Sequence, residues 1–131
     1  MKRFLCSLAI AMAASGSLAE DITEGELLYL EYCVTCHGFN LDGMGPMAGV
    51  LTIKPDNLTT LSQNNDGVFP VVRVIGRIDG RDPLVSHGSP MPVYGQFFQG
   101  LDVAMKAPTG QPIMTSQPIA DLVAYLKSVQ Q

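Results

Sequence analysis

The pentapeptide Cys33-Val34-Thr35-Cys36-His37 decides how this chain is interpreted. Two cysteines separated by two residues and followed directly by a histidine form the pattern of covalent haem attachment. Each thiol can form a thioether bond to the porphyrin edge, and the imidazole of His37 can coordinate the iron. The pattern predicts one covalently bound haem c, attached through Cys33 and Cys36, with His37 as an axial iron ligand. A haem would also supply much of the core of so short a chain.

Three other uses of the same residues are weaker. A thioredoxin-like dithiol needs a strand-helix-strand context, whereas the residues before Cys33 carry the signals of a helix. A structural zinc site usually needs four nitrogen or sulfur ligands, and after export the chain offers only His87 besides the pentapeptide. A disulfide between Cys33 and Cys36 would leave His37 without a role.

The amino-terminal segment has the pattern of a secretory signal peptide. Lys2 and Arg3 precede an apolar run over residues 4–14, and Ser17 and Ala19 supply the small residues of a cleavage site. The apolar run is too short to span a membrane. The pattern therefore predicts export to the periplasm. An uncleaved segment that anchors the protein to the membrane is the alternative.

We expect cleavage after Ala19, so that residues 1–19 are the signal peptide and residues 20–131 form one domain. The formal net charge of the chain is −4, and loss of the two basic residues of the signal peptide makes it −6. Nucleic-acid binding calls for a basic patch, so that class of partner is excluded. An acidic surface favours a redox partner with a basic docking face, although solubility alone would also account for the charge.

Residues 24–33 are predicted to form the first helix. Thr23 is its candidate N-cap, and Glu26 lies three residues later as in a capping box. Gly25 is a poor helix former, so we expect another backbone to approach the helix closely at that position.

Two further helices are predicted near the middle and the end of the chain. The first begins at Pro70, because the apolar residues at 71, 74, 75 and 78 share one helical face, although their β-branched side chains also favour a strand. The second covers residues 117–129, where apolar residues at 119, 122, 123 and 126 form one stripe. The segment 106–117 is predicted to be a loop. Arg73, Arg77 and Arg81 either meet the haem propionates or form a solvated face.

A glycine-rich loop follows His37 and contains Pro46. An iron-bound histidine usually gives its other ring proton to a backbone carbonyl, which fixes the orientation of the ring. Pro46 has no N–H but keeps its carbonyl. We therefore expect the Pro46 carbonyl to accept a hydrogen bond from the second ring nitrogen of His37. An ordinary turn role for Pro46 is the alternative.

Met91 is the predicted sixth iron ligand. It lies between Pro90 and Pro92, which restrict the backbone on both sides and so reduce the cost of holding the thioether in place. A thioether opposite a histidine is one known way to complete the coordination of haem iron. His87 is the strongest competitor. The other methionines of the mature chain lack flanking prolines and are typical gap-fillers of a core: Met44, Met47, Met105 and Met114.

The order of these elements resembles the class I (monohaem) c-type cytochromes of the bacterial periplasm, over essentially the whole mature chain. The matching residues are Gly25, Tyr29, Cys33-Val34-Thr35-Cys36-His37, Gly45-Pro46, Met91-Pro92-Val93-Tyr94-Gly95 and Ala120-Asp121-Leu122-Val123-Ala124-Tyr125-Leu126. The resemblance implies an all-α cytochrome c fold whose first and last helices cross at right angles, with Gly25 at the contact. It also implies a haem edge exposed for electron exchange. The chain lacks tryptophan, which many members of that family place near a propionate.

The expected function follows from the coordination. With His37 and Met91 both bound, the iron has no open position, so electron transport is expected and enzymatic activity is not. Two alternatives stay open. The protein is a haem subunit of a larger periplasmic oxidoreductase, or, less expected, it binds a gas or acts as a peroxidase at an open iron site.

Overall fold

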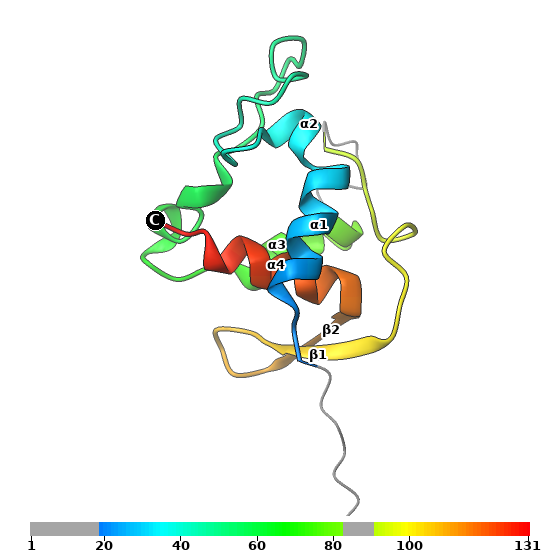
Figure 1. Cartoon of the computed structure of the whole chain (residues 1–131). Helices are drawn as coiled ribbons and strands as arrows, with labels where there is room; N and C mark the ends of the chain where they lie inside the picture. Colours follow the sequence, from blue (N-terminus) through cyan, green and yellow to red (C-terminus); the bar gives the residue numbers. More distant parts are fainter. Residues whose placement is uncertain (1–18, 83–90) are drawn as a thin grey trace, which may run out of the picture.

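The computed structural model describes residues 19–82 and 91–131. Residues 1–18 of the predicted signal peptide lie outside these ranges. The competing ligand His87 also lies outside them. The elements in chain order are α1 (Ile22–Tyr32), α2 (Val34–His37), the 3-10 helices η1 (Leu58–Thr60) and η2 (Gln63–Asn65), α3 (Val71–Asp79), β1 (Asp102–Lys106), β2 (Pro112–Ser116) and α4 (Gln117–Ser128) (Figure 1). Within the described ranges, none of the helices combines the length and the apolar character that crossing a membrane requires.

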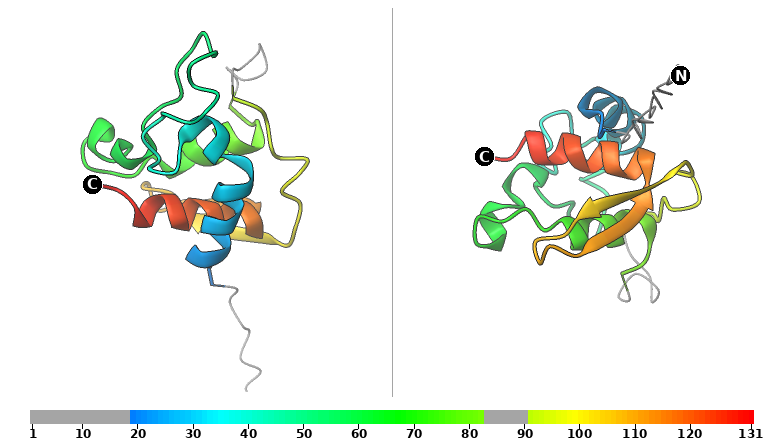
Figure 2. Two further views of the ribbon diagram at one scale, coloured as in Figure 1. Left: turned by 45° about the horizontal axis from the view of Figure 1, so that its top comes forward. Right: turned by 90° about the horizontal axis from the view of Figure 1, so that it is seen from below.

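The crossing of α1 over α4 organises the fold, and it is visible in the views of Figures 1 and 2. At the crossing, Gly25 lies against the backbone of Asp121, where a side chain on residue 25 would overlap the Asp121 carbonyl. One turn further along α1, Tyr29 packs on Tyr125 with ring centroids 5.6 Å apart. The close backbone approach predicted at Gly25 is confirmed.

The start of α1 differs from the prediction. Asp21, and not Thr23, is the N-cap: its carboxylate accepts hydrogen bonds from the N–H groups of Thr23 (2.8 Å) and Glu24 (3.2 Å). The Asp21 N–H in turn donates to the buried carboxylate of Asp121 over 2.8 Å. Asp21 has the extended backbone that a cap requires, and its bond to α4 involves a residue 100 positions away, which no local pattern contains.

The predicted helix after Pro70 is confirmed as α3, and the strand alternative is wrong. Val71, Ile75 and Ile78 are its buried residues, as the helical spacing indicated. The last helix is confirmed as α4, which ends one residue before the predicted position 129. Tyr29 of α1 and the apolar side chains of α3 and α4 form one core cluster.

A short hairpin replaces part of the predicted loop at 106–117. Strands β1 and β2 pair antiparallel, with Met105 opposite Ile113, and Met105 and Thr115 are the buried residues of the two strands. The glycine and proline signals in this segment mark the turn between the strands. The molecule is otherwise helical, and the predicted cytochrome-like helical architecture is retained (Figure 1).

Candidate haem site

Two adjoining cavities lie between α2, α3 and the segment that contains Met91. Their volumes are about 370 Å³ and about 510 Å³, within the range typical of cofactor sites. The residues that line both are Cys33, His37, Asp56, Arg77, Met91 and Tyr94. The predicted attachment and ligand residues are thus brought together, although more than 50 positions of sequence separate Met91 from His37.

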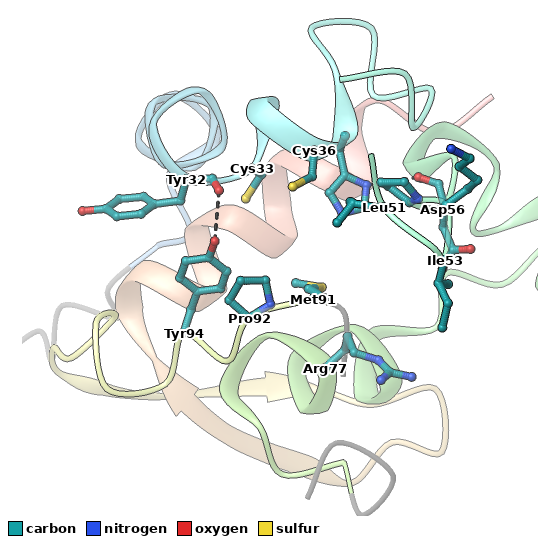
Figure 3. A pocket seen from close by; sticks show the side chains of 13 residues that line it. Tyr32, Cys33, Cys36, Leu51, Ile53, Asp56, Arg77, Met91, Pro92 and Tyr94 are labelled. Carbon is teal, nitrogen blue, oxygen red and sulfur yellow. Dashed lines mark hydrogen bonds between the residues drawn. The ribbon is translucent and has the colours of Figure 1, made fainter. Parts of the chain in front are cut away.

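Cys36 of α2 and Cys33, the residue that joins α1 to α2, both line the first cavity. In Figure 3 their sulfur atoms face the cavity, and Met91 lies across it from them. Cys33 and Cys36 are free thiols that form no disulfide with each other. Burial, and then the neighbouring Cys36, raise the pKa of Cys33 to about 12. The described residues also contain no cluster of three or more histidine, cysteine or acidic side chains that would hold a zinc ion.

The imidazole of His37 is oriented by Asp56. The His37 Nδ1 lies 3.1 Å from the Asp56 backbone carbonyl oxygen. Because a carbonyl only accepts, Nδ1 carries the proton, and Nε2 keeps the lone pair that a metal binds. Burial lowers the pKa of His37, while the hydrogen bond to Asp56 opposes this shift. The ring is therefore held neutral, which is the ligating form.

The prediction that the Pro46 carbonyl accepts the hydrogen bond of His37 is wrong, because the acceptor is the Asp56 carbonyl. The Gly45 N–H donates to the Cys36 carbonyl (3.1 Å) and the Met47 N–H donates to the Thr35 carbonyl (3.0 Å). The segment around Pro46 is therefore occupied in satisfying the carbonyls of α2, and Pro46 itself is exposed. Gly45 permits this approach, since a side chain there would overlap the backbone of Thr35 and Cys36. The sequence at residues 55–57 predicted a turn, but nothing in it indicated that the Asp56 carbonyl contacts His37.

Met91 is the methionine that the fold brings to the site. It is half-buried and packs at the edge of the core. The competing methionines line neither cavity: Met44, Met47 and Met114 are exposed, and Met105 is the buried residue of β1. His87 lies outside the described residues.

Two of the three candidate arginines border the cavities. Arg77 lines both, and Arg73 lines the second. The guanidinium of Arg77 also pairs with Asp82 at 3.5 Å. Arg81 lines neither cavity, because its guanidinium pairs with Asp79 and donates to the Met114 carbonyl over 2.7 Å. Arg73 and Arg77 both lie on α3, so their positive charge is on one side of the site, where it would suit the propionates of a haem.

Part of the lining of the second cavity is apolar. It is formed by Tyr29, Ile78, Phe98, Leu122 and Leu126. An apolar pocket with two thiols and an unprotonated imidazole nitrogen on one wall, a thioether on the other and cations at one side fits a haem. The residues present therefore fit the cofactor that the pentapeptide predicts.

Comparison with known proteins agrees with this site. The family model described as "Cytochrome c" matches residues 22–130, which is nearly the whole described chain. None of the curated proteins and none of the solved structures matches the chain.

Proposed function

Because the chain belongs to the cytochrome c family, whose members hold covalently attached haem c and transfer electrons, we propose that it is a one-electron carrier of the periplasm with His37 and Met91 as the axial iron ligands. One observation carries the proposal. Met91 lines the same cavities as Cys33 and His37 from the opposite wall, and none of the other described methionines does.

The chain's own residues account for electron carriage. When bound, the haem supplies an iron that changes by one electron between its ferrous and ferric forms. Asp56 fixes the His37 ring. His37 and Met91 would both hold the iron, so that no position would be left for a substrate. A thioether ligand raises the reduction potential. The apolar wall excludes water and so disfavours the more positive ferric state, and the two covalent bonds from α2 limit rearrangement between the states.

The charge of α1 supports a redox partner with a basic docking face. Four acidic residues lie at its start and one near its end: Glu20, Asp21, Glu24, Glu26 and Glu31. Residues 22–32 contain no basic side chain. Glu31 is exposed near the end of α1, which is the end of the helix that adjoins Cys33. Opposite charge on a partner would accelerate docking at this side.

A role as the haem subunit of a larger periplasmic oxidoreductase is the second candidate. It is favoured by the loop that follows His37, where Phe39 is 76 % exposed, Met44 78 % and Val50 75 %. Several large apolar side chains exposed in one loop are typical of a surface that another protein covers. A complex that persists through purification at native abundance would favour this role over a free carrier.

The proposal is tested on protein exported together with haem-attachment machinery. Optical spectra of the oxidised, reduced and carbon monoxide-treated forms should show a six-coordinate haem whose ferrous spectrum carbon monoxide does not rapidly change. Met91→Ala should abolish the long-wavelength sulfur-to-iron absorption of the ferric form and lower the potential. Met114→Ala is the matched control, because Met114 lines neither cavity. An unchanged spectrum of Met91→Ala would contradict the assignment of Met91 as a ligand. Rapid carbon monoxide binding by the unaltered protein would favour an open iron site.

The mass of the exported protein tests the proposed processing. A mature chain that begins at Glu20 supports residues 1–19 as a cleaved signal peptide and a periplasmic domain over 20–131. A mass that retains residues 1–19 on a membrane-bound protein would support the anchored alternative.

A further inference from the structure

We infer that the hydroxyl of Tyr94 is a positioning group for Met91, because it fastens the segment that carries Met91 to the end of α1 beside the haem cysteines. The inference rests on the proposed ligation by Met91. It assigns to Tyr94 control over how readily an external ligand displaces the methionine.

The hydroxyl of Tyr94 donates to the backbone carbonyl of Tyr32 over 3.1 Å (Figure 3). Tyr32 is the last residue of α1, and its carbonyl is one of those at a helix end that have no intrahelical donor. The next N–H groups do not supply one, because those of Cys36 and His37 donate to the Cys33 carbonyl instead. Tyr94 thus satisfies a helix-end carbonyl that directly precedes the first haem cysteine.

The chain between Met91 and Tyr94 is short and restricted. Pro92 fixes one φ angle within it. The Tyr94 N–H donates to the Ile78 carbonyl of α3 over 2.7 Å, and Val93 packs against Gly80, where a side chain would overlap it. Tyr94 is therefore bonded to α3 by its backbone and to α1 by its side chain. A movement that withdraws Met91 from the cavity pulls on this doubly bonded residue.

The ring of Tyr94 makes contacts that do not depend on its hydroxyl. It stacks on Phe98 with centroids 5.3 Å apart and planes at 14°, and it meets Tyr32 edge-on at 6.0 Å. Tyr94→Phe keeps these ring contacts and removes only the bond to the Tyr32 carbonyl. Both the fold and the ring packing are expected to survive this change.

Ser128 provides a control away from the site. Its hydroxyl donates to the Tyr125 carbonyl over 2.7 Å, and Ser128 lines neither cavity. Ser128→Ala therefore also removes one side-chain hydrogen bond to a backbone carbonyl near a helix end, but outside the haem site. If Tyr94 acts only through general stability, the two variants should behave alike.

The experiment measures the affinity of the ferric haem protein for imidazole by optical titration, in the unaltered protein and in the variants Y94F, S128A and M91A. A net hydrogen-bond contribution to holding the methionine predicts that Y94F binds imidazole about three- to tenfold more tightly. We expect S128A to stay within about twofold of the unaltered protein. Thermal unfolding of the same samples reports whether both variants lose comparable stability.

The outcomes separate this inference from the proposed ligation. M91A should bind imidazole more tightly than any other variant, and an affinity equal to that of the unaltered protein would overturn the ligation itself. If M91A behaves as expected but Y94F stays within twofold of the unaltered protein, the positioning role of Tyr94 is wrong. The same conclusion holds if S128A gains as much affinity as Y94F.

Discussion

Gly25 and Asp121 bring α1 and α4 into direct backbone contact. A Cβ atom added at Gly25 would overlap the Asp121 carbonyl and lie 2.9 Å from the Cβ of Tyr125. The side chain of Asp121 reinforces the same crossing, because it accepts from the Asp21 N–H over 2.8 Å and from the Gln117 side-chain amide over 2.7 Å. The first and last helices of the described residues are thereby held together.

Gly25→Ala should destabilise the protein by about 1–3 kcal/mol, because the added methyl group forces the two helices apart. Urea unfolding of the haem protein, followed by circular dichroism, measures the loss. Gly49→Ala is the control, since a Cβ at Gly49 meets nothing within 4 Å, and we expect a change within about 0.5 kcal/mol there. Equal stability of the Gly25 variant and the unaltered protein would contradict the close contact.

Replacing both Cys33 and Cys36 by Ala should allow acid-organic solvent to extract the haem, because no thioether bond then remains. Either single replacement should leave the haem attached through the other sulfur, so the single variants are the controls. Extraction followed by a spectrum of the protein fraction makes the measurement. Haem that stays with the double variant would reveal a different attachment.

Arg77→Gln should lower the reduction potential, because the charge of Arg77 borders both cavities and disfavours the more positive ferric state. Coulomb's law at protein-like dielectric constants predicts a shift of roughly tens of millivolts, reduced by the Asp82 carboxylate at 3.5 Å. Arg81→Gln removes the same charge away from the cavities and should change the potential less. Potentiometric titration compares the reduction potentials of the two variants. A larger shift for Arg81→Gln than for Arg77→Gln would contradict the position of Arg77 beside the haem.

Stability should fall as the pH rises above about 10, partly because of Tyr29. Burial, followed by the charges of Cys33, Tyr125 and Asp42, raises the pKa of the Tyr29 phenol. Above pH 10 the unfolded chain loses this proton while the folded chain retains it, so unfolding is favoured, by up to about 1.4 kcal/mol per pH unit.

Tyr29→Phe removes the part of this pH dependence that comes from the Tyr29 phenol. It also lowers stability at neutral pH, because the hydrogen bond to the Gly38 carbonyl is lost. The expected result is a less steep decline in the urea midpoint between pH 9 and pH 11 than in the unaltered protein. Parallel declines in the two proteins would show that the phenol of Tyr29 does not titrate differently on folding.

Periodicity and spacing were sufficient where one segment determines its own structure. The apolar spacing of Val71, Ile75 and Ile78 predicted a helix against their β-branched propensity, and all three are buried on α3. The unfavourable position of Gly25 within a helix predicted its backbone contact. The prolines around Met91 singled out the methionine that lines the cavities.

Features that depend on distant partners were missed. Nothing near Asp56 in the sequence indicates that its carbonyl faces His37, 19 positions away, and nothing near Asp21 indicates its bond to Asp121. The hairpin was missed for another reason. In β2 the apolar Met114 is exposed and the polar Thr115 is buried, so the strand lacks the apolar-polar alternation that would have predicted it.

The hairpin also offers a place to engineer the molecule. Gly110 lies at its turn with positive φ, and a Cβ there would meet nothing within 4 Å. None of the residues from β1 to β2 lines either cavity. A short peptide tag or a fluorescent label should therefore be accepted at this tip, since exposed turns tolerate insertions. Such a handle would let the protein be immobilised on an electrode with its haem crevice left accessible.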